Sequence, residues 1–180
     1  MAELFEKSPS NRFLWLIKDP THKLVRGEMV KMRAEYQKPH GYGEWLIAVA
    51  VNDLGYRCGY VGLPKKDPLY GMSYDDEKIF DAVQVHCGLT FSGTRNFITP
   101  DLWFFGFDCG HIGDAIDITT AEGKARFDCE ITDFRNWLLE GHVWTLEEVI
   151  AESECLANQL IRLSQAMRGD AFNEKNDNNG

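Results

Sequence analysis

The sequence has no apolar run that approaches the roughly 18 residues a membrane-spanning helix needs. Its first residues, MAELFEKSPSNR, also lack the cationic start and the apolar stretch of a secretory signal. Basic residues are scarce, with 19 Lys and Arg against 28 Asp and Glu, for a formal net charge of −9. We therefore expect a cytoplasmic protein with no membrane partner and no direct nucleic acid binding, because phosphates would be repelled.

The cysteines are few, and neither their number nor their spacing suggests pairs, because the count of five is odd and no CxxC occurs. This excludes a dense disulfide scaffold and the usual paired ligands of a structural zinc site. We expect reduced thiols, with Cys58, Cys129 and Cys155 buried as small apolar side chains. Cys87 and Cys109 are different, because each has a histidine close by in the sequence.

Several catalytic signatures are missing as well. The sequence has no P-loop, no dinucleotide-binding glycine pattern, no GxSxG elbow and no internal repeat. Its 180 residues, 44% of them apolar, suit one domain with a core of its own. We expect residues 1–168 to form a single globular domain and 169–180 to form a flexible C-terminal tail.

The patterns that are present predict an α+β fold. Two β-rich runs within 45–64 flank a turn that ends in Gly55, which is typical of a hairpin. Residues 81–93 alternate as a third strand, with His86 on the face opposite the valines, and 101–108 form a fourth that is apolar on both faces. Hairpins followed by helices favour an antiparallel or mixed sheet with helices packed on it.

A long C-terminal amphipathic helix is expected to pack on that sheet. Thr145 followed by Glu148 is a capping box. A stripe of apolar residues then recurs at helical spacing, namely Val149, Leu156, Leu160, Leu163 and Met167. Between sheet and helix, the segment FRNWLLEG predicts a short helix that stops at Gly141.

Reactive side chains gather in two segments. FGFDCGHIGD places Asp108, Cys109, His111 and Asp114 where an apolar strand ends between glycines, and VHCGLTFSG supplies His86 and Thr90. Strand ends lead side chains out of the core toward a cleft. If the two segments are neighbours, His86 meets Asp108 and His111, and we predict that these three come together.

Three chemistries fit these residue types. A metal could bind His86, His111 and a carboxylate from Asp108 or Asp114. Cys109 could act as a thiolate nucleophile, with His86 or His111 as its base and Asp108 orienting that base. The same groups could instead hold a polar ligand, aided by aromatic residues such as Tyr70. The spacings distinguish none of these, so the sequence assigns no metal ligands.

A purely structural interpretation also stays open. Asp108 and Asp114 can cap turns through their side chains, as Asp beside Gly commonly does. His86 can be a core histidine bonded to Asp75 or Asp76. The strand aromatics are expected in the core, namely Trp45, Trp103, Phe104 and Phe105.

Taken together, four segments resemble an uncharacterised family of phage and prophage proteins: GYVGLPKKDPLYG, YDD, VHCGLTFSG and WFFGFDCGHIGD. The resemblance implies a phage or bacterial origin and a location in the bacterial cytoplasm, and no named activity. Two positions depart from the family pattern, Asp67 where members often have His and Cys87 where members often have Gly. The matching site positions are Tyr70, His86, Thr90, Asp108, Cys109, His111 and Asp114.

These observations favour a polar cleft that binds a small polar ligand, with a nucleotide-derived ligand as one candidate. His86, Asp108, Cys109 and His111 would form its reactive part, with Tyr70, Thr90 and Asp114 as ligand-binding residues. A Cys/His or metal-dependent hydrolase or transferase is the enzyme alternative. An acidic protein that binds and inhibits a host system is the third.

Overall fold

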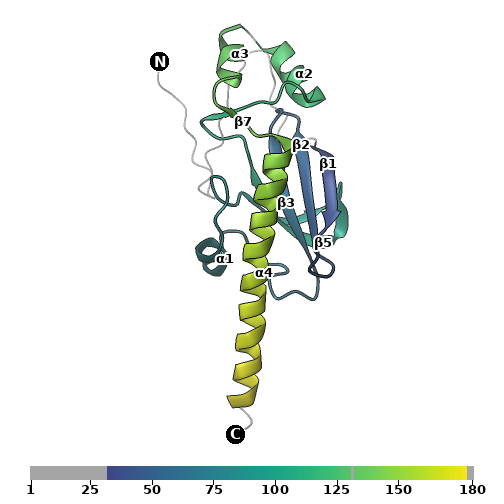
Figure 1. Ribbon diagram of the computed structural model, residues 1–180, viewed down its shortest axis with the longest axis vertical. Helices are drawn as coiled ribbons and strands as arrows, with labels where there is room; N and C mark the ends of the chain where they lie inside the picture. Colours follow the sequence, from purple (N-terminus) through teal and green to yellow (C-terminus); the bar gives the residue numbers. More distant parts are fainter. Residues whose placement is uncertain (1–31, 131, 178–180) are drawn as a thin grey trace, which may run out of the picture.

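The computed structural model describes residues 32–130 and 132–177 of the chain. Five of its strands form one antiparallel sheet in the order β1-β2-β3-β5-β4. A long helix, α4, lies along one face of this sheet (Figure 1). The α+β prediction is therefore confirmed. The strands are β1 (Met32–Pro39), β2 (Leu46–Asn52), β3 (Arg57–Pro64), β4 (Phe91–Arg95) and β5 (Thr99–Asp108).

The predicted hairpin is the pair β2–β3. Asn52 organises its turn, because its side-chain oxygen accepts the N–H groups of Leu54 and Tyr56, each at 3.0 Å. Gly55 takes a positive φ of 87°, which a residue with a Cβ rarely adopts. The predicted strand at 101–108 lies within β5, which is interior to the sheet. Phe104 and Phe105 point to opposite faces and are both fully buried, as expected.

Helix α4 (Leu146–Asp177) packs on β2 and β3. Thr145 and Glu148 form the predicted capping box, since each backbone N–H donates to the other's side chain, at 2.8 and 3.2 Å. Val149, Leu156 and Leu160 of the predicted stripe are fully buried. The helix continues past residue 168, where the flexible tail was expected to begin, as far as Asp177.

The predicted strand at 81–93 is wrong. Asp76 caps a six-residue helix, α1 (Glu77–Ala82), by accepting the N–H of Lys78 at 3.0 Å. Residues 83–90 follow as a loop, and β4 begins only at Phe91. The backbone of Gln84 in this loop bonds to α4 instead of a strand, because Gln159 accepts its N–H at 2.7 Å and donates to its carbonyl at 2.9 Å.

The remaining elements gather where α4 begins (Figure 1). They are α2 (Ala121–Cys129), α3 (Thr132–Leu138) and the short parallel strands β6 (Asp114–Ala115) and β7 (His142–Val143). Helix α3 matches the predicted short helix, and Gly141 after it has a φ of 116°. A Cβ at Gly141 would collide with the carbonyl of Gly113. The chain segments that lead into β6 and β7 therefore approach this closely only with glycine at position 141.

None of the helices in the described part of the chain combines the length and the apolar character that crossing a bilayer requires. The expectation about a secretory signal concerns residues outside the described ranges.

Candidate functional site

Asp114 is the centre of the polar cluster. Its side chain is only 4% exposed, and its Oδ2 lies 2.8 Å from Nε2 of His86. The same oxygen accepts the backbone N–H of His111 at 2.9 Å, and Oδ1 accepts the indole N–H of Trp144 at 3.0 Å. A carboxylate only accepts hydrogen bonds, so Asp114 fixes a proton on Nε2 of His86.

Two opposing effects act on the pKa of Asp114. Burial alone would raise it, because a charged carboxylate loses hydration. The hydrogen bonds from His86, His111 and Trp144 stabilise the charged form and together lower the pKa below its ordinary value. Asp114 is therefore an ionised, fully bonded anchor at neutral pH.

The ring of His111 lies between two carboxylates without a hydrogen bond to either. Its Nδ1 is 3.6 Å from Oδ2 of Asp114 and 3.7 Å from Oδ1 of Asp108. These separations exceed a hydrogen bond, and Nδ1 is buried with no hydrogen-bond partner. An unsatisfied buried ring nitrogen carries a free-energy cost that a ligand can remove.

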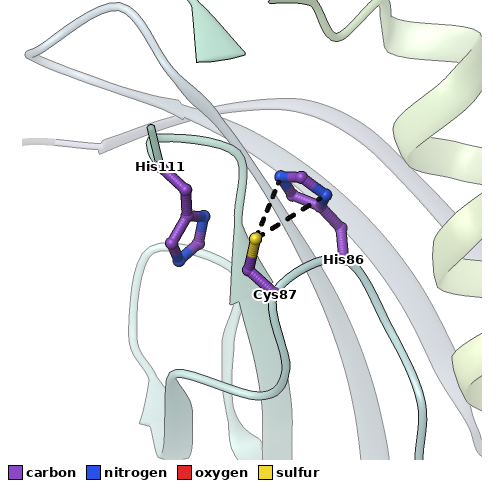
Figure 2. A group of neighbouring side chains, drawn as sticks. All are labelled: His86, Cys87 and His111. Carbon is purple, nitrogen blue, oxygen red and sulfur yellow. Dashed lines mark hydrogen bonds between the residues drawn. The ribbon is translucent and has the colours of Figure 1, made fainter. Parts of the chain in front are cut away.

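An unusual backbone conformation places the Cys87 side chain next to these histidines. Its φ of 51° makes it the one non-glycine residue of the described chain with a positive φ, and Gly88 follows at 84°. Consecutive side chains of an extended chain point apart, whereas this left-handed turn puts Cys87 beside His86 (Figure 2). Its Sγ lies 3.7 Å from Nε2 and 4.0 Å from Nδ1 of His86. Such backbone strain is often found at functional sites.

Together, His86, Cys87 and His111 offer three ligand atoms that all lie within 4.8 Å of one another (Figure 2). The rings of His86 and His111 meet edge-on, with centroids 5.4 Å apart. Loss of hydration, and then the charges of Asp114 and Asp108, raise the pKa of the Cys87 thiol. We call these three residues together with Asp108 and Asp114 the histidine–carboxylate cluster.

Helix α4 and the residue before its cap hold the loop of His86 in place. Glu152 on α4 accepts the backbone N–H of His86 at 2.8 Å. The indole of Trp144 lies against the His86 ring, with centroids 4.5 Å apart. Trp144 is itself tied to the sheet, because its carbonyl accepts a hydrogen bond from the buried Arg57 at 2.8 Å.

Four of the residues predicted from the sequence are brought together, namely His86, Asp108, His111 and Asp114. Asp108 also has the structural role left open above, since it accepts the N–H of Gly110 at 3.1 Å. The partner of His86 is Asp114, however, and neither Asp75 nor Asp76.

Cys109 does not fit its predicted role as a nucleophile. It is 1% exposed in the core, and burial raises the pKa of its thiol far above the usual range. A thiol that stays protonated and out of reach of solvent cannot attack a substrate. The cause is its position just after β5, where its backbone N–H donates to the carbonyl of Arg57 at 2.9 Å and keeps the chain against β3.

Tyr70 and Thr90 lie outside the cluster. Tyr70 packs on Trp103 with ring centroids 5.6 Å apart, and Trp103 is five strand positions from Asp108, or about 17 Å. Thr90 donates its N–H to the carbonyl of Gly106 at 2.9 Å, about 7 Å along β5 from Asp108. Tyr70 is therefore a packing residue, and Thr90 is held to β5 by this backbone bond.

The cysteine predictions are correct in part. All five thiols are free, and Cys58 is buried as expected. Cys129 and Cys155 are exposed, because both lie on the outer sides of amphipathic helices. For these two residues the prediction of burial is wrong.

Asp67, one of the two departures from the family pattern, is buried in the structure. It accepts hydrogen bonds from Ser164 at 2.9 Å and Arg168 at 2.8 Å, both on α4. The carboxylate thus fastens the loop after β3 to the helix, which is a structural role at a distance from the cluster.

The sequence analysis singled out Cys87 without including it in the predicted site, and it missed Trp144 and Glu152. Cys87 is adjacent to His86 in the sequence, and a turn at Gly88 would have predicted that the two side chains lie together. Trp144 and Glu152 carried no such signal, because they reach His86 only through the packing of α4.

Comparisons of the chain with protein-family models, with curated proteins and with solved structures found no match.

Proposed function

We propose that the protein binds a small polar ligand at the histidine–carboxylate cluster. The observation that carries this proposal is the Nδ1 atom of His111, which is buried and has no hydrogen-bond partner. Its nearest acceptors stand at 3.6 and 3.7 Å, just too far to satisfy it. A ligand that bonds to this nitrogen would recover the free energy lost by its burial.

The charge of the surroundings limits the kind of ligand. Asp108 lies beside the ring of His111, Asp114 bonds to the ring of His86, and Glu152 accepts the backbone N–H of His86. Carboxylates repel a phosphate, which weighs against the nucleotide-derived ligand considered above. A neutral polar or cationic ligand fits this potential better.

Binding is favoured over cysteine-based turnover. Cys109 is buried, and the pKa of Cys87 is raised, so neither thiol is an activated thiolate. A hydrolase or transferase using this cluster would need a cation to activate its nucleophile. The phage resemblance and a bacterial cytoplasmic location are part of the proposal as its biological setting.

Native mass spectrometry tests this function on protein purified without chelators or denaturation. Wild-type protein is expected to carry a bound mass in addition to the chain. His111→Ala should lose that mass, whereas His40→Ala, which removes a histidine of the β1–β2 loop, should keep it. A wild-type spectrum of the bare chain, or a bound mass that persists in His111→Ala, contradicts the proposal.

A further inference from the structure

We propose that the ligand is a zinc-class transition-metal ion, bound by Cys87 Sγ and by one ring nitrogen each from His86 and His111. This inference rests on the proposed function, because it names the ligand of the same cluster. The two proposals can be tested separately, because a bound ligand other than a metal ion would support the proposed function and contradict the metal site.

The spacing of the donor atoms is the first argument. Zinc bonds of about 2.3 Å to sulfur and 2.0–2.1 Å to nitrogen, arranged as a tetrahedron, separate their donors by roughly 3.3–3.5 Å. Cys87 Sγ lies 3.7 and 4.0 Å from the two nitrogens of His86, and all three donors fit within 4.8 Å. Side-chain rotations that move the donor atoms by about 1 Å would bring all three within bonding distance of one ion. Cys87 is exposed on its loop, which permits such a movement.

The donor chemistry is the second argument. Imidazole and thiolate are the ligands that zinc and its neighbours prefer, whereas Mg²⁺ and Ca²⁺ prefer sets made of oxygen. Three protein ligands leave one tetrahedral position open, as in zinc sites that bind water or a substrate. The left-handed turn at Cys87 and Gly88 presents the thiol to the histidines.

The surroundings supply the outer contacts that metal-bound histidines require. Asp114 Oδ2 is 2.8 Å from Nε2 of His86, and Oδ1 of the same carboxylate accepts the indole N–H of Trp144. This carboxylate serves either as the outer hydrogen-bond acceptor of a ligated histidine or, if the ion takes Nε2, as the fourth ligand.

The charge around the cluster also favours a cation. The carboxylates of Asp114 and Asp108 stand 3.6 and 3.7 Å from Nδ1 of His111 and place negative charge beside the three donor atoms. A divalent ion offsets those charges and binds the thiolate, with release of a proton. The buried nitrogen of His111 would gain the partner that the protein does not provide.

Titration with Co²⁺ under reducing, anaerobic conditions tests the assignment, since Co²⁺ bound by a thiolate gives a near-ultraviolet charge-transfer band. We expect one ion per chain and this band in the wild type. Cys87→Ser should abolish the band and weaken Co²⁺ binding at least about tenfold. His111→Ala should weaken binding similarly and keep part of the band.

Cys155→Ser is the matched control, because it removes an exposed thiol of α4 outside the cluster. It should bind Co²⁺ as the wild type does. No band in the wild type, or a band that survives Cys87→Ser, overturns the metal assignment. An organic mass found by native mass spectrometry in metal-free wild type would keep the proposed function and exclude this one.

Discussion

Asp114 is the residue on which the candidate site depends most. It accepts hydrogen bonds from three groups and is almost fully enclosed. Hydrogen bonds to a charged acceptor contribute more than neutral ones, roughly 1.5–3 kcal/mol each before the cost of burial. Removing the charge therefore affects stability as well as the orientation of His86.

Asp114→Asn is predicted to lower the free energy of unfolding by about 2 kcal/mol at pH 7. The pKa of Asp114 is lower in the folded state than its unfolded value of about 3.9, so the charge stabilises the fold above that pH. This contribution is lost as the pH falls through the folded pKa. Urea unfolding of both proteins at pH 7 and in acid should show a difference that shrinks below about pH 4.

Asp108→Asn provides the comparison for that measurement. The Asp108 side chain is 34% exposed, and its Oδ1 lies 3.7 Å from Nδ1 of His111, beyond hydrogen-bond distance. Its substitution should change the free energy of unfolding by less than about 0.5 kcal/mol. Equal effects of the two substitutions would show that Asp114 does not organise the cluster.

The five thiols should separate into two classes. Cys87, Cys129 and Cys155 are exposed, whereas Cys58 and Cys109 are buried, and burial raises the pKa of Cys58 to about 12. In native protein an aromatic disulfide reagent should label three thiols rapidly and the other two only after unfolding. Mass spectrometry of the labelled peptides identifies them, and rapid labelling of Cys109 would contradict its placement in the core.

At the scale of elements, α4 holds both the sheet and the site. Its buried stripe packs on β2 and β3, while Glu152 and Gln159 grip the loop that carries His86. A helix that slipped from the sheet would therefore carry the His86 loop with it.

Leu160→Asp is predicted to destabilise the protein by about 3–5 kcal/mol, because it buries an unpaired charge in this interface. Asn158→Asp adds the same charge to the exposed side of α4 and should change little. Thermal melts followed by circular dichroism measure both. A melting temperature of Leu160→Asp close to that of the wild type would mean that α4 is not docked through this stripe.

The sequence predicted those elements whose signals are local. The turn at Asn52 to Gly55, the apolar run of β5 and the capping box of Thr145 each act within a few residues, and each predicted element is present. The alternation of Val83, Val85 and Cys87 was misleading, since the intervening Gln84 and His86 donate their backbone N–H groups to side chains of α4 and not to a neighbouring strand. An apolar residue at every second position does not show which groups form hydrogen bonds with the backbone of that segment.

The site itself could be predicted only in part. His86, Asp108, His111 and Asp114 stood out because reactive residues gathered beside glycines at the end of an apolar run. The bond between His86 and Asp114 joins residues of different segments, and Trp144 completes it from the start of α4. Such convergence is a property of packing over long sequence separations, which local patterns do not encode.

At the scale of the whole molecule, the site is assembled from three segments that only the complete fold brings together: residues 85–88, 108–114 and 144–152. Ligand binding should therefore stabilise the folded state as a whole. The excess of acidic residues, 28 against 19 basic ones, also favours a cationic ligand over an anionic one.

Zinc should raise the melting temperature of the full chain. An ion that binds only the folded state stabilises it by about 2.7 kcal/mol at a hundredfold excess over its Kd. A chelator should return the melting temperature to its starting value, and Cys87→Ser should respond to zinc far less. A shift that zinc produces equally in Cys87→Ser would mean that the ion binds elsewhere.

The most direct measurement is an anomalous difference map at the zinc absorption edge, from crystals of the wild type grown with Zn²⁺. The account predicts a peak about 2.0–2.3 Å from Cys87 Sγ and from one ring nitrogen of each of His86 and His111. Asp114 would then contact His86 or the ion itself. A map with no peak between these three side chains, in crystals that contain zinc, would contradict the account.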